Sequence, residues 1–327
     1  MSWFAPAAPG ERKVLARWSA GVGPPVVREA REPHEPAADS LVIVSWNIAL
    51  GAGDVTRALR DVRSAHPGAH VVLLLQEAFR DGPEVPHSDA GRMLFAGKLG
   101  GASRDRLEIE AIAGRERLHL YYVPSMRNGP PVVSDEDRGN AILSTLPLSD
   151  FTAIELPFER QRRVAVAATV SGRAPGGRPW RLRVVSSHLD NMVGARRGWI
   201  LGSEFARIRQ ARAIVEHLRQ EPAVVLGGDF NTWFGFHEQT TSEIARAFPA
   251  TDLHDRRPTF AGLLRLDHLF FRLPDGWEGQ VRRASDRYGS DHYPLVARID
   301  LRGAPGASGR SRSGRGEGRP APAGAAR

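Results

Sequence analysis

This chain of 327 residues contains six short apolar runs, each directly beside a polar side chain of a type that catalyses reactions or binds metals. Each run has the length of a buried β-strand, and strand ends are where a rigid scaffold presents functional residues. The polar residues of the six units are Asn47, Glu77, His188, Asp229 with Asn231, Asp267, and Asp291 with His292. The recurrence predicts a strand-rich fold in which these side chains meet in one pocket.

The first two units belong to a predicted strand-helix-strand motif. Residues 41–45 and 71–75 are apolar runs of strand length, and Asp54 is a suitable N-cap for a helix between them. Parallel pairing of the two strands would bring Asn47 and Glu77 together. Asn47 alone is slightly better explained as a turn amide, whereas Glu77 needs a partner at a buried strand end.

The remaining hydrophobic patterns predict an α/β fold. Further strands are expected at residues 118–123, 139–144, 164–170, 181–187, 223–226, 269–271 and 295–299, and further helices at 11–18, 91–99 and 200–218. In the helix at 200–218, the apolar face is expected to consist of Leu201, Phe205, Ile208, Ala211, Val215 and Leu218. Arg207 and Gln210 are expected on its flank, solvated or bridging.

Two acids and a histidine lie close together near the C-terminus, in Leu266-Asp267-His268 and Gly289-Ser290-Asp291-His292-Tyr293-Pro294. An Asp that accepts from one imidazole nitrogen leaves the other nitrogen free for a proton or a phosphate oxygen. By itself the Ser-Asp-His tripeptide is more often a turn cap or a solvated loop. Its meaning depends on the units that precede it.

Composition divides the chain into a body and two flanking segments. The formal charge is +8, but the six arginines and one glutamate of residues 301–327 carry +5 of it. We expect a partly ordered, Pro-rich N-terminal extension at 1–39, one domain at 40–302, and a disordered basic tail at 303–327. The basic charge favours a polyanionic partner, although arginine-rich composition also reflects a GC-rich genome.

The absence of cysteine excludes disulfides, thiolate catalysis and Cys-ligated metals. There is no 18-residue apolar run, and the N-terminus has neither a cationic start nor an apolar core of a signal peptide. We therefore expect a soluble, cytoplasmic protein without a transmembrane segment; protein partners are not predicted.

Oxygen donors dominate the six units, and oxygen is the donor that a hard cation such as Mg²⁺ prefers. His188 and His292 are too few and too far apart for a recognisable zinc motif. The economical interpretation is a phosphoesterase that uses Mg²⁺, with Mn²⁺ as an alternative, to neutralise phosphate charge while a base activates water.

Seven motifs, taken in order, are together similar to those of the endonuclease/exonuclease/phosphatase superfamily. They are Ser45-Trp46-Asn47, Leu75-Gln76-Glu77, Gly139-Asn140-Ala141-Ile142-Leu143-Ser144, Ser187-His188-Leu189, Gly228-Asp229-Phe230-Asn231, Arg265-Leu266-Asp267-His268, and the stretch from Gly289 to Pro294. The resemblance covers about residues 40–302. It implies a four-layer α/β sandwich, with two mixed β-sheets face to face, helices outside and the active site at one edge.

The resemblance also implies residue roles. Asn47 and Glu77 would hold Mg²⁺, with Asp291 near the metal. Asp229 and Asn231 would position the attacking water or the phosphate. His292 would be a general base or a phosphate contact oriented by Asp267, and His188 would stabilise the phosphate in the transition state. Whether Asp229 or His292 is the base stays open, because closely coupled groups can share that role.

Within the superfamily, the histidines at 188 and 292 are more similar to the deoxyribonuclease and sphingomyelinase branch than to abasic-site endonucleases. Ala49 stands where some nucleases of the superfamily have an acidic residue. We therefore expect a nuclease acting on nucleic acid, either as an endonuclease or as an exonuclease. The alternatives are a phosphatase or lipid phosphodiesterase, for which Trp233, Phe234 and Phe236 are a modest indication, and a non-catalytic nucleic-acid-binding module.

Overall fold

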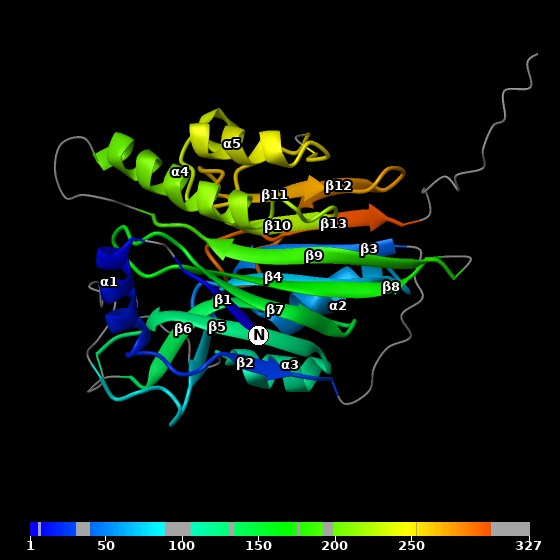
Figure 1. Cartoon of the computed structure of the whole chain (residues 1–327). Coiled ribbons are helices and arrows are strands. Elements are labelled where there is room, and N and C mark those ends of the chain that lie inside the picture. Colours follow the sequence, from blue (N-terminus) through cyan, green and yellow to red (C-terminus); the bar gives the residue numbers. More distant parts are fainter. Residues whose placement is uncertain are drawn as a thin grey trace, which may run out of the picture.

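Two mixed β-sheets packed face to face form the centre of the protein (Figure 1). The computed structural model describes residues 1–5, 8–30, 40–88, 106–130, 134–174, 177–191, 199–252 and 254–301. The helix predicted at 91–99 and the tail predicted at 303–327 lie outside these residues. The boundaries of the domain at 40–302 stay a prediction.

The described residues form one six-stranded and one seven-stranded sheet. The first has the order β1 (Ser2–Phe4), β7 (Leu148–Glu155), β8 (Val164–Arg173), β9 (Pro179–His188), β10 (Val224–Asp229) and β11 (Asp267–Arg272). The second has the order β12 (Glu278–Arg283), β13 (Leu295–Asp300), β3 (Ser40–Asn47), β4 (His70–Asp81), β6 (Glu136–Ser144), β5 (His119–Arg127) and β2 (Val26–Arg28).

Three apolar layers hold the sheets and helices together. Side chains from both sheets, such as Ile43 of β3 and Val184 of β9, form the layer between them. The outer face of the second sheet packs against α2 (Val55–Ala65) and α3 (Ile109–Glu116). The outer face of the first packs against α4 (Trp199–His217) and α5 (Gln239–Ala247). This arrangement confirms the predicted four-layer α/β sandwich.

The nine predicted strands all lie within strands of the structure, apart from two residues, 118 and 223, at the starts of β5 and β10. The parallel pairing of β3 with β4 is also confirmed, with Asn47 opposite Gln76. Asp54 is the N-cap of the helix between them, and its side chain accepts from the Arg57 backbone N–H at 2.9 Å. In the described part of the chain, no helix is long and apolar enough to cross a membrane.

The predicted apolar face of α4 was wrong at Phe205, whereas Arg207 and Gln210 make bridging contacts, as one of the two predicted alternatives had it, but they are buried and not on a solvated flank. Phe205 is 71% exposed, whereas Arg207 and Gln210 are buried. Gln210 is buried because its amide oxygen accepts from the Asp190 backbone N–H at 2.9 Å. Arg207 pairs with Glu238 at 2.7 Å. Polar residues on the buried face therefore shift the packing surface of the helix away from its most apolar stripe.

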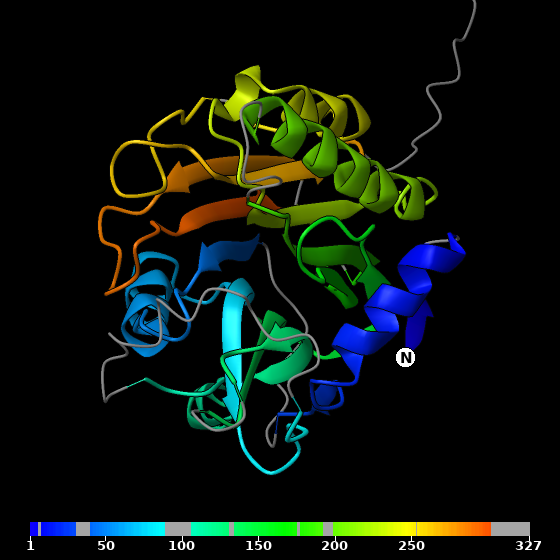
Figure 2. The same cartoon turned by 90° about the vertical axis from the view of Figure 1, so that its left-hand side faces the viewer.

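Residues before β3 extend both sheets, which the sequence did not predict. β1 pairs with β7 at the edge of the first sheet, β2 pairs with β5 at the edge of the second, and α1 (Pro9–Ser19) lies between them (Figure 2). The turn after α1 is fixed by Asp137, whose carboxylate accepts from the Gly23 N–H and the Tyr122 hydroxyl, both at 2.8 Å. Arg80 pairs with the same carboxylate and donates to the Pro24 carbonyl at 2.9 Å.

Candidate active site

The predicted site residues converge at one edge of the sandwich because of strand pairing. β9 and β10 are parallel and in register, so His188 lies opposite Asp229. β11 runs antiparallel to β10 and places Asp267 on the other side of Asp229. Three neighbouring strands thus present an imidazole and two carboxylates in one row. This edge, where β9 ends, lies on the left in Figure 1 and faces the viewer in Figure 2.

Asp229 is at the centre of the cluster and is 2% exposed. Its Oδ2 accepts from the Asn47 side-chain amide at 3.0 Å, and its Oδ1 accepts from the Asn231 backbone N–H at 2.9 Å. His188 Nε2 lies 3.4 Å from Oδ2, and His292 Nε2 lies 3.8 Å from the same oxygen. Residues from both sheets therefore surround one buried carboxylate.

His292 is held in place from three sides. Its Nδ1 lies 2.8 Å from Oδ2 of the buried Asp267. Its backbone N–H donates to Ser290 Oγ at 3.0 Å, and its carbonyl accepts from the Trp46 indole N–H at 3.0 Å. Ser290 in turn donates to the Asn47 carbonyl at 2.7 Å. This leaves Nε2 directed toward Asp229. The contact with Asp267 is the one that the family resemblance implied, and the catalytic role of His292 stays a prediction.

Burial and mutual charge shift the acid-base behaviour of this pair. Burial raises the pKa of Asp229 to about 6, even though the charge of His292 opposes the rise. For His292, burial works against the charged form, but the carboxylates of Asp267 and Asp229 outweigh it and raise the pKa to about 10. The imidazole therefore carries its proton at neutral pH, whereas Asp229 titrates near neutrality.

Glu77 reaches the site through an irregularity in β4. The pairing of β4 with β6 shifts between Leu75 and Ala78, and Glu77 has a left-handed backbone with a φ of 53°. Bulges of this kind re-aim a side chain. Glu77 Oε1 lies 3.3 Å from Arg138 Nη1. Glu77 also lines a small cavity together with His188.

The sequence analysis missed the arginines of this cavity. Arg138 and Arg163 line it beside Glu77 and His188. Both arginines are buried, and Arg163 Nε lies 3.5 Å from Oδ1 of the fully buried Asp190. Burial lowers the pKa of Arg138. Their positions before apolar runs were the only available signal, and among 45 cationic residues that signal selects no individual arginine.

The donor set fits a divalent cation. Ligand atoms of Asp229, Asp267 and His292 lie within 4.8 Å of one another, and the two carboxylates offer oxygen donors even when His292 carries its proton. Oδ1 of Asp267 is buried and has no hydrogen-bond partner among the described residues, so it is available to a cation. The predicted ligand Asp291 lies at the rim, with Oδ1 3.9 Å from His292 Nε2. Of the other two predicted ligands, Asn47 contacts Asp229 and Glu77 contacts Arg138. The role of these three as ligands stays a prediction.

The sequence model of the Endonuclease/Exonuclease/phosphatase family matches residues 44–292, a range that contains all eight predicted site residues. The chain belongs to this family. Its members act on phosphoester bonds. The family resemblance inferred from the seven motifs is thereby confirmed.

A solved structure with a TM-score above 0.5 supports the fold, and two others are similar to this chain. A family protein from Beutenbergia cavernae is 22% identical, covers 83% of this chain and 74% of its own, and has a TM-score of 0.55. A family protein from Bacteroides thetaiotaomicron is 14% identical, with coverages of 80% and 97% and a TM-score of 0.46. A Neisseria 3' phosphatase bound to a product DNA hairpin is 17% identical, with coverages of 79% and 98% and a TM-score of 0.49. No curated protein matches.

In this endonuclease/exonuclease/phosphatase family protein, Asp229→Asn should stabilise the metal-free fold at high pH. The folded-state pKa of Asp229 is raised from its ordinary 3.8 to about 6, so its stabilising contribution is complete below pH 3.8 and is lost as pH rises through 6. At pH 8 the charged carboxylate destabilises the fold. In chelator, the variant should exceed the wild type in free energy of unfolding by about 1–3 kcal/mol at pH 8. Urea unfolding at pH 8 and pH 4 checks this.

The advantage of the variant should disappear at pH 4, where the wild-type carboxyl is largely neutral in the folded protein. Equal or lower stability of Asp229→Asn at pH 8 would contradict the assignment of a desolvated carboxylate at this position.

Proposed function

We propose that this protein is a Mg²⁺-dependent phosphodiester hydrolase that acts on nucleic acid. The observation that carries the proposal is the convergence of His188, Asp229, Asp267 and His292 at one sheet edge, beside two buried arginines. A row of acids and imidazoles joined to guanidinium groups suits a phosphate that must be bound, neutralised and attacked by water.

Asp229 is the better candidate for the general base. A base works best when its pKa lies near the operating pH, and the pKa of Asp229 is raised to about 6. Asn47 and the Asn231 N–H hold the carboxylate in a fixed orientation, at 3.0 and 2.9 Å. The raised pKa of His292 instead suits a proton-bearing donor to a phosphate oxygen.

The remaining residues supply charge around the phosphate. His188, 5% exposed and beside Asp229, would donate to a second phosphate oxygen. Arg138 and Arg163 would neutralise the phosphate from the adjoining cavity. Glu77, Asn47 and Asp291 would hold Mg²⁺. When bound, the cation supplies Lewis-acid stabilisation and a water of lowered pKa.

Buried arginines beside the cluster support a substrate that carries phosphate. The net charge of +8 is a weaker argument, because residues 301–327 carry +5 of it. Arginine donates a planar fork of N–H groups that matches phosphate oxygens. Backbone phosphates recognised in this way provide the affinity, and the cluster around Asp229 provides the hydrolysis.

A lipid phosphodiesterase is the second candidate, and one observation favours it. Phe234 and Leu263 are 62% and 81% exposed. In the sequence, Phe234 lies shortly after Asn231 and Leu263 lies shortly before Asp267. The loop of Leu263 touches the site directly, because the ring of Phe260 lies 4.8 Å from that of His292. Phe236 is not part of this apolar rim, since it packs on His268 at 4.7 Å.

His292→Ala should lower kcat by about 100-fold or more while the protein stays folded, because it removes a charged donor to the phosphate. The matched control is His254→Ala, whose side chain is 98% exposed outside the cluster. Hydrolysis of bis(p-nitrophenyl) phosphate in Mg²⁺ measures both. Near-wild-type turnover of His292→Ala would remove this histidine from the mechanism.

Glu77→Gln should raise the Mg²⁺ concentration needed for half-maximal activity by about tenfold or more, because a charged oxygen ligand is lost. Glu278→Gln, an exposed change on β12, should leave the metal titration unchanged. A wild-type titration curve for Glu77→Gln would refute the assignment of this carboxylate as a ligand.

A substrate panel separates nuclease, lipid phosphodiesterase and binding module. We expect cleavage of plasmid, single-stranded DNA or RNA in Mg²⁺ to exceed that of a phosphomonoester and of sphingomyelin vesicles. The variant Phe234→Ser with Leu263→Ser should leave nucleic-acid cleavage intact. If this variant instead loses about tenfold in cleavage of sphingomyelin vesicles and keeps its other activities, the result would favour the lipid reaction. DNA binding without cleavage of any substrate would favour the non-catalytic module.

A further inference from the structure

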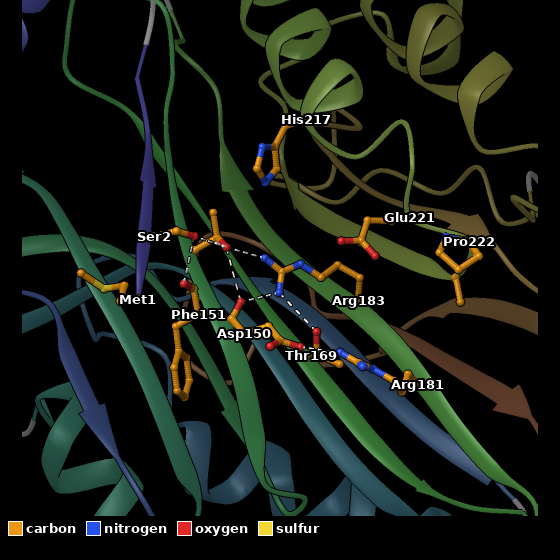
Figure 3. A pocket seen from close by; sticks show the side chains of 12 residues that line it. Met1, Ser2, Asp150, Phe151, Thr169, Arg181, Arg183, His217, Glu221 and Pro222 are labelled. Carbon is orange, nitrogen blue, oxygen red and sulfur yellow. Dashed lines mark hydrogen bonds and ion pairs between the residues drawn. The ribbon is translucent and has the colours of Figure 1, made fainter.

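A cavity of about 1010 Å³ lies on the outer face of the first sheet, away from the candidate active site (Figure 3). Its floor consists of β7, β8 and β9, and its wall includes His217 at the end of α4 and the loop before β10. Arg183, in the floor, precedes His188 by five residues on β9, which corresponds to about 16 Å along a strand. The cavity is therefore distinct from the catalytic cluster.

Arg183 is fixed flat on the floor of this cavity and is 5% exposed. Its Nη1 donates to the Asp150 carbonyl at 2.6 Å and to Thr169 Oγ1 at 3.3 Å. Its Nη2 donates to Thr152 Oγ1 at 2.7 Å. These three acceptors are uncharged, and they orient the guanidinium without neutralising it.

One edge of the guanidinium has no matching acceptor. The buried Nε of Arg183 has no hydrogen-bond partner among the described residues, and Nη2 has a second N–H beyond the one used by Thr152. These two N–H groups are adjacent and parallel, which is the arrangement that binds two oxygens of one carboxylate or phosphate. In Figure 3, His217 and Glu221 lie on the side of the guanidinium away from Asp150 and Thr169.

The charges of Glu221 and Asp150 favour the charged form of Arg183, but among the described residues neither forms an ion pair with it. Arg181, at the rim, is already paired with Asp150 Oδ2 at 2.6 Å. Within the described ranges, no carboxylate oxygen lies within ion-pair distance of Arg183, although Glu221 stands nearby in the cavity wall. Burial lowers the pKa of Arg183, which reflects a charge taken out of water. Such a charge is costly unless an anion joins it.

We propose that this cavity is a second binding site, which takes a small molecule carrying a carboxylate or phosphate group and holds that group on the free edge of Arg183. The volume suits a ligand up to the size of a nucleotide. Thr152 and Thr169 preorganise the guanidinium, so little conformational entropy is lost on binding. The site is independent of the phosphodiesterase proposal, because it shares no residue with the catalytic cluster.

The test follows the Arg183 Nε–H signal by ¹⁵N-edited NMR, assigned by its loss in Arg183→Lys. Full-length protein is titrated separately with inorganic phosphate and with sodium acetate. We expect a saturable downfield shift of this signal with at least one probe, and the responding probe identifies the preferred group. An unchanged signal with both probes overturns the proposal. Because this signal comes from Arg183 alone, binding of phosphate at the catalytic cluster is not expected to shift it.

Two variants separate ligand binding from a purely structural role of Arg183. The backbone amides of Thr152 and Thr169 report binding in each variant. Arg183→Lys keeps the charge but lacks the fork, and should bind the responding probe about tenfold more weakly or worse. Glu221→Gln removes a neighbouring negative charge without touching the hydrogen bonds of Arg183, and should tighten binding severalfold. Wild-type affinity in Arg183→Lys, or weaker binding in Glu221→Gln, overturns the proposal.

Turnover of bis(p-nitrophenyl) phosphate should be unchanged in both variants. Arg183 and Glu221 lie outside the catalytic cluster, so failure of this site would leave the phosphodiesterase proposal untouched.

Discussion

The structure depends on a carboxylate buried where two β-sheets meet. Asp229 ends β10 in one sheet, and the amide of Asn47, at the end of β3 in the other sheet, donates to it at 3.0 Å. This bond joins the two sheets at the edge where the chemistry is proposed. A desolvated carboxylate is costly, and cations or N–H donors offset the cost. The surrounding imidazoles, amide and backbone N–H are therefore what permits the acid to remain there.

Strand registry explains how residues far apart in sequence reach that carboxylate. β9, β10 and β11 are paired without irregularity, so His188, Asp229 and Asp267 fall in one row. The approach of β9 to β10 is close: a Cβ on Gly228 would lie 2.0 Å from the Ser187 carbonyl oxygen. Glycine before Asp229 thus brings the strands close enough for imidazole and carboxylate to interact.

The sequence predicted most of the strands, because buried strands are continuous apolar runs. It also singled out eight candidate site residues, because polar side chains at strand ends are conspicuous, and their roles stay a prediction. It missed Arg138 and Arg163, because a role for these arginines is indicated only by the carboxylates that strand pairing places beside them. It missed β1 and β2 for a related reason. Three-residue edge strands carry little periodicity, and they form because β5 and β7 offer unpaired edges.

The alternation of side chains along β9 lets one strand serve two unrelated surfaces. Val184 packs between the sheets, and Ser186 donates to the Leu75 carbonyl of the opposite sheet. Alternate residues of β9 that include these two and His188 therefore face the other sheet. Val185 packs against the helices on the outer face of the sheet, and Arg183, two residues earlier, lies on the same face. Past the reach of α4, the outer face changes from apolar to polar, where Arg183 meets Thr169. The same strand thereby ends in an imidazole at the catalytic edge and places the buried guanidinium of Arg183 in the floor of the distal cavity, and the two sites share no residue.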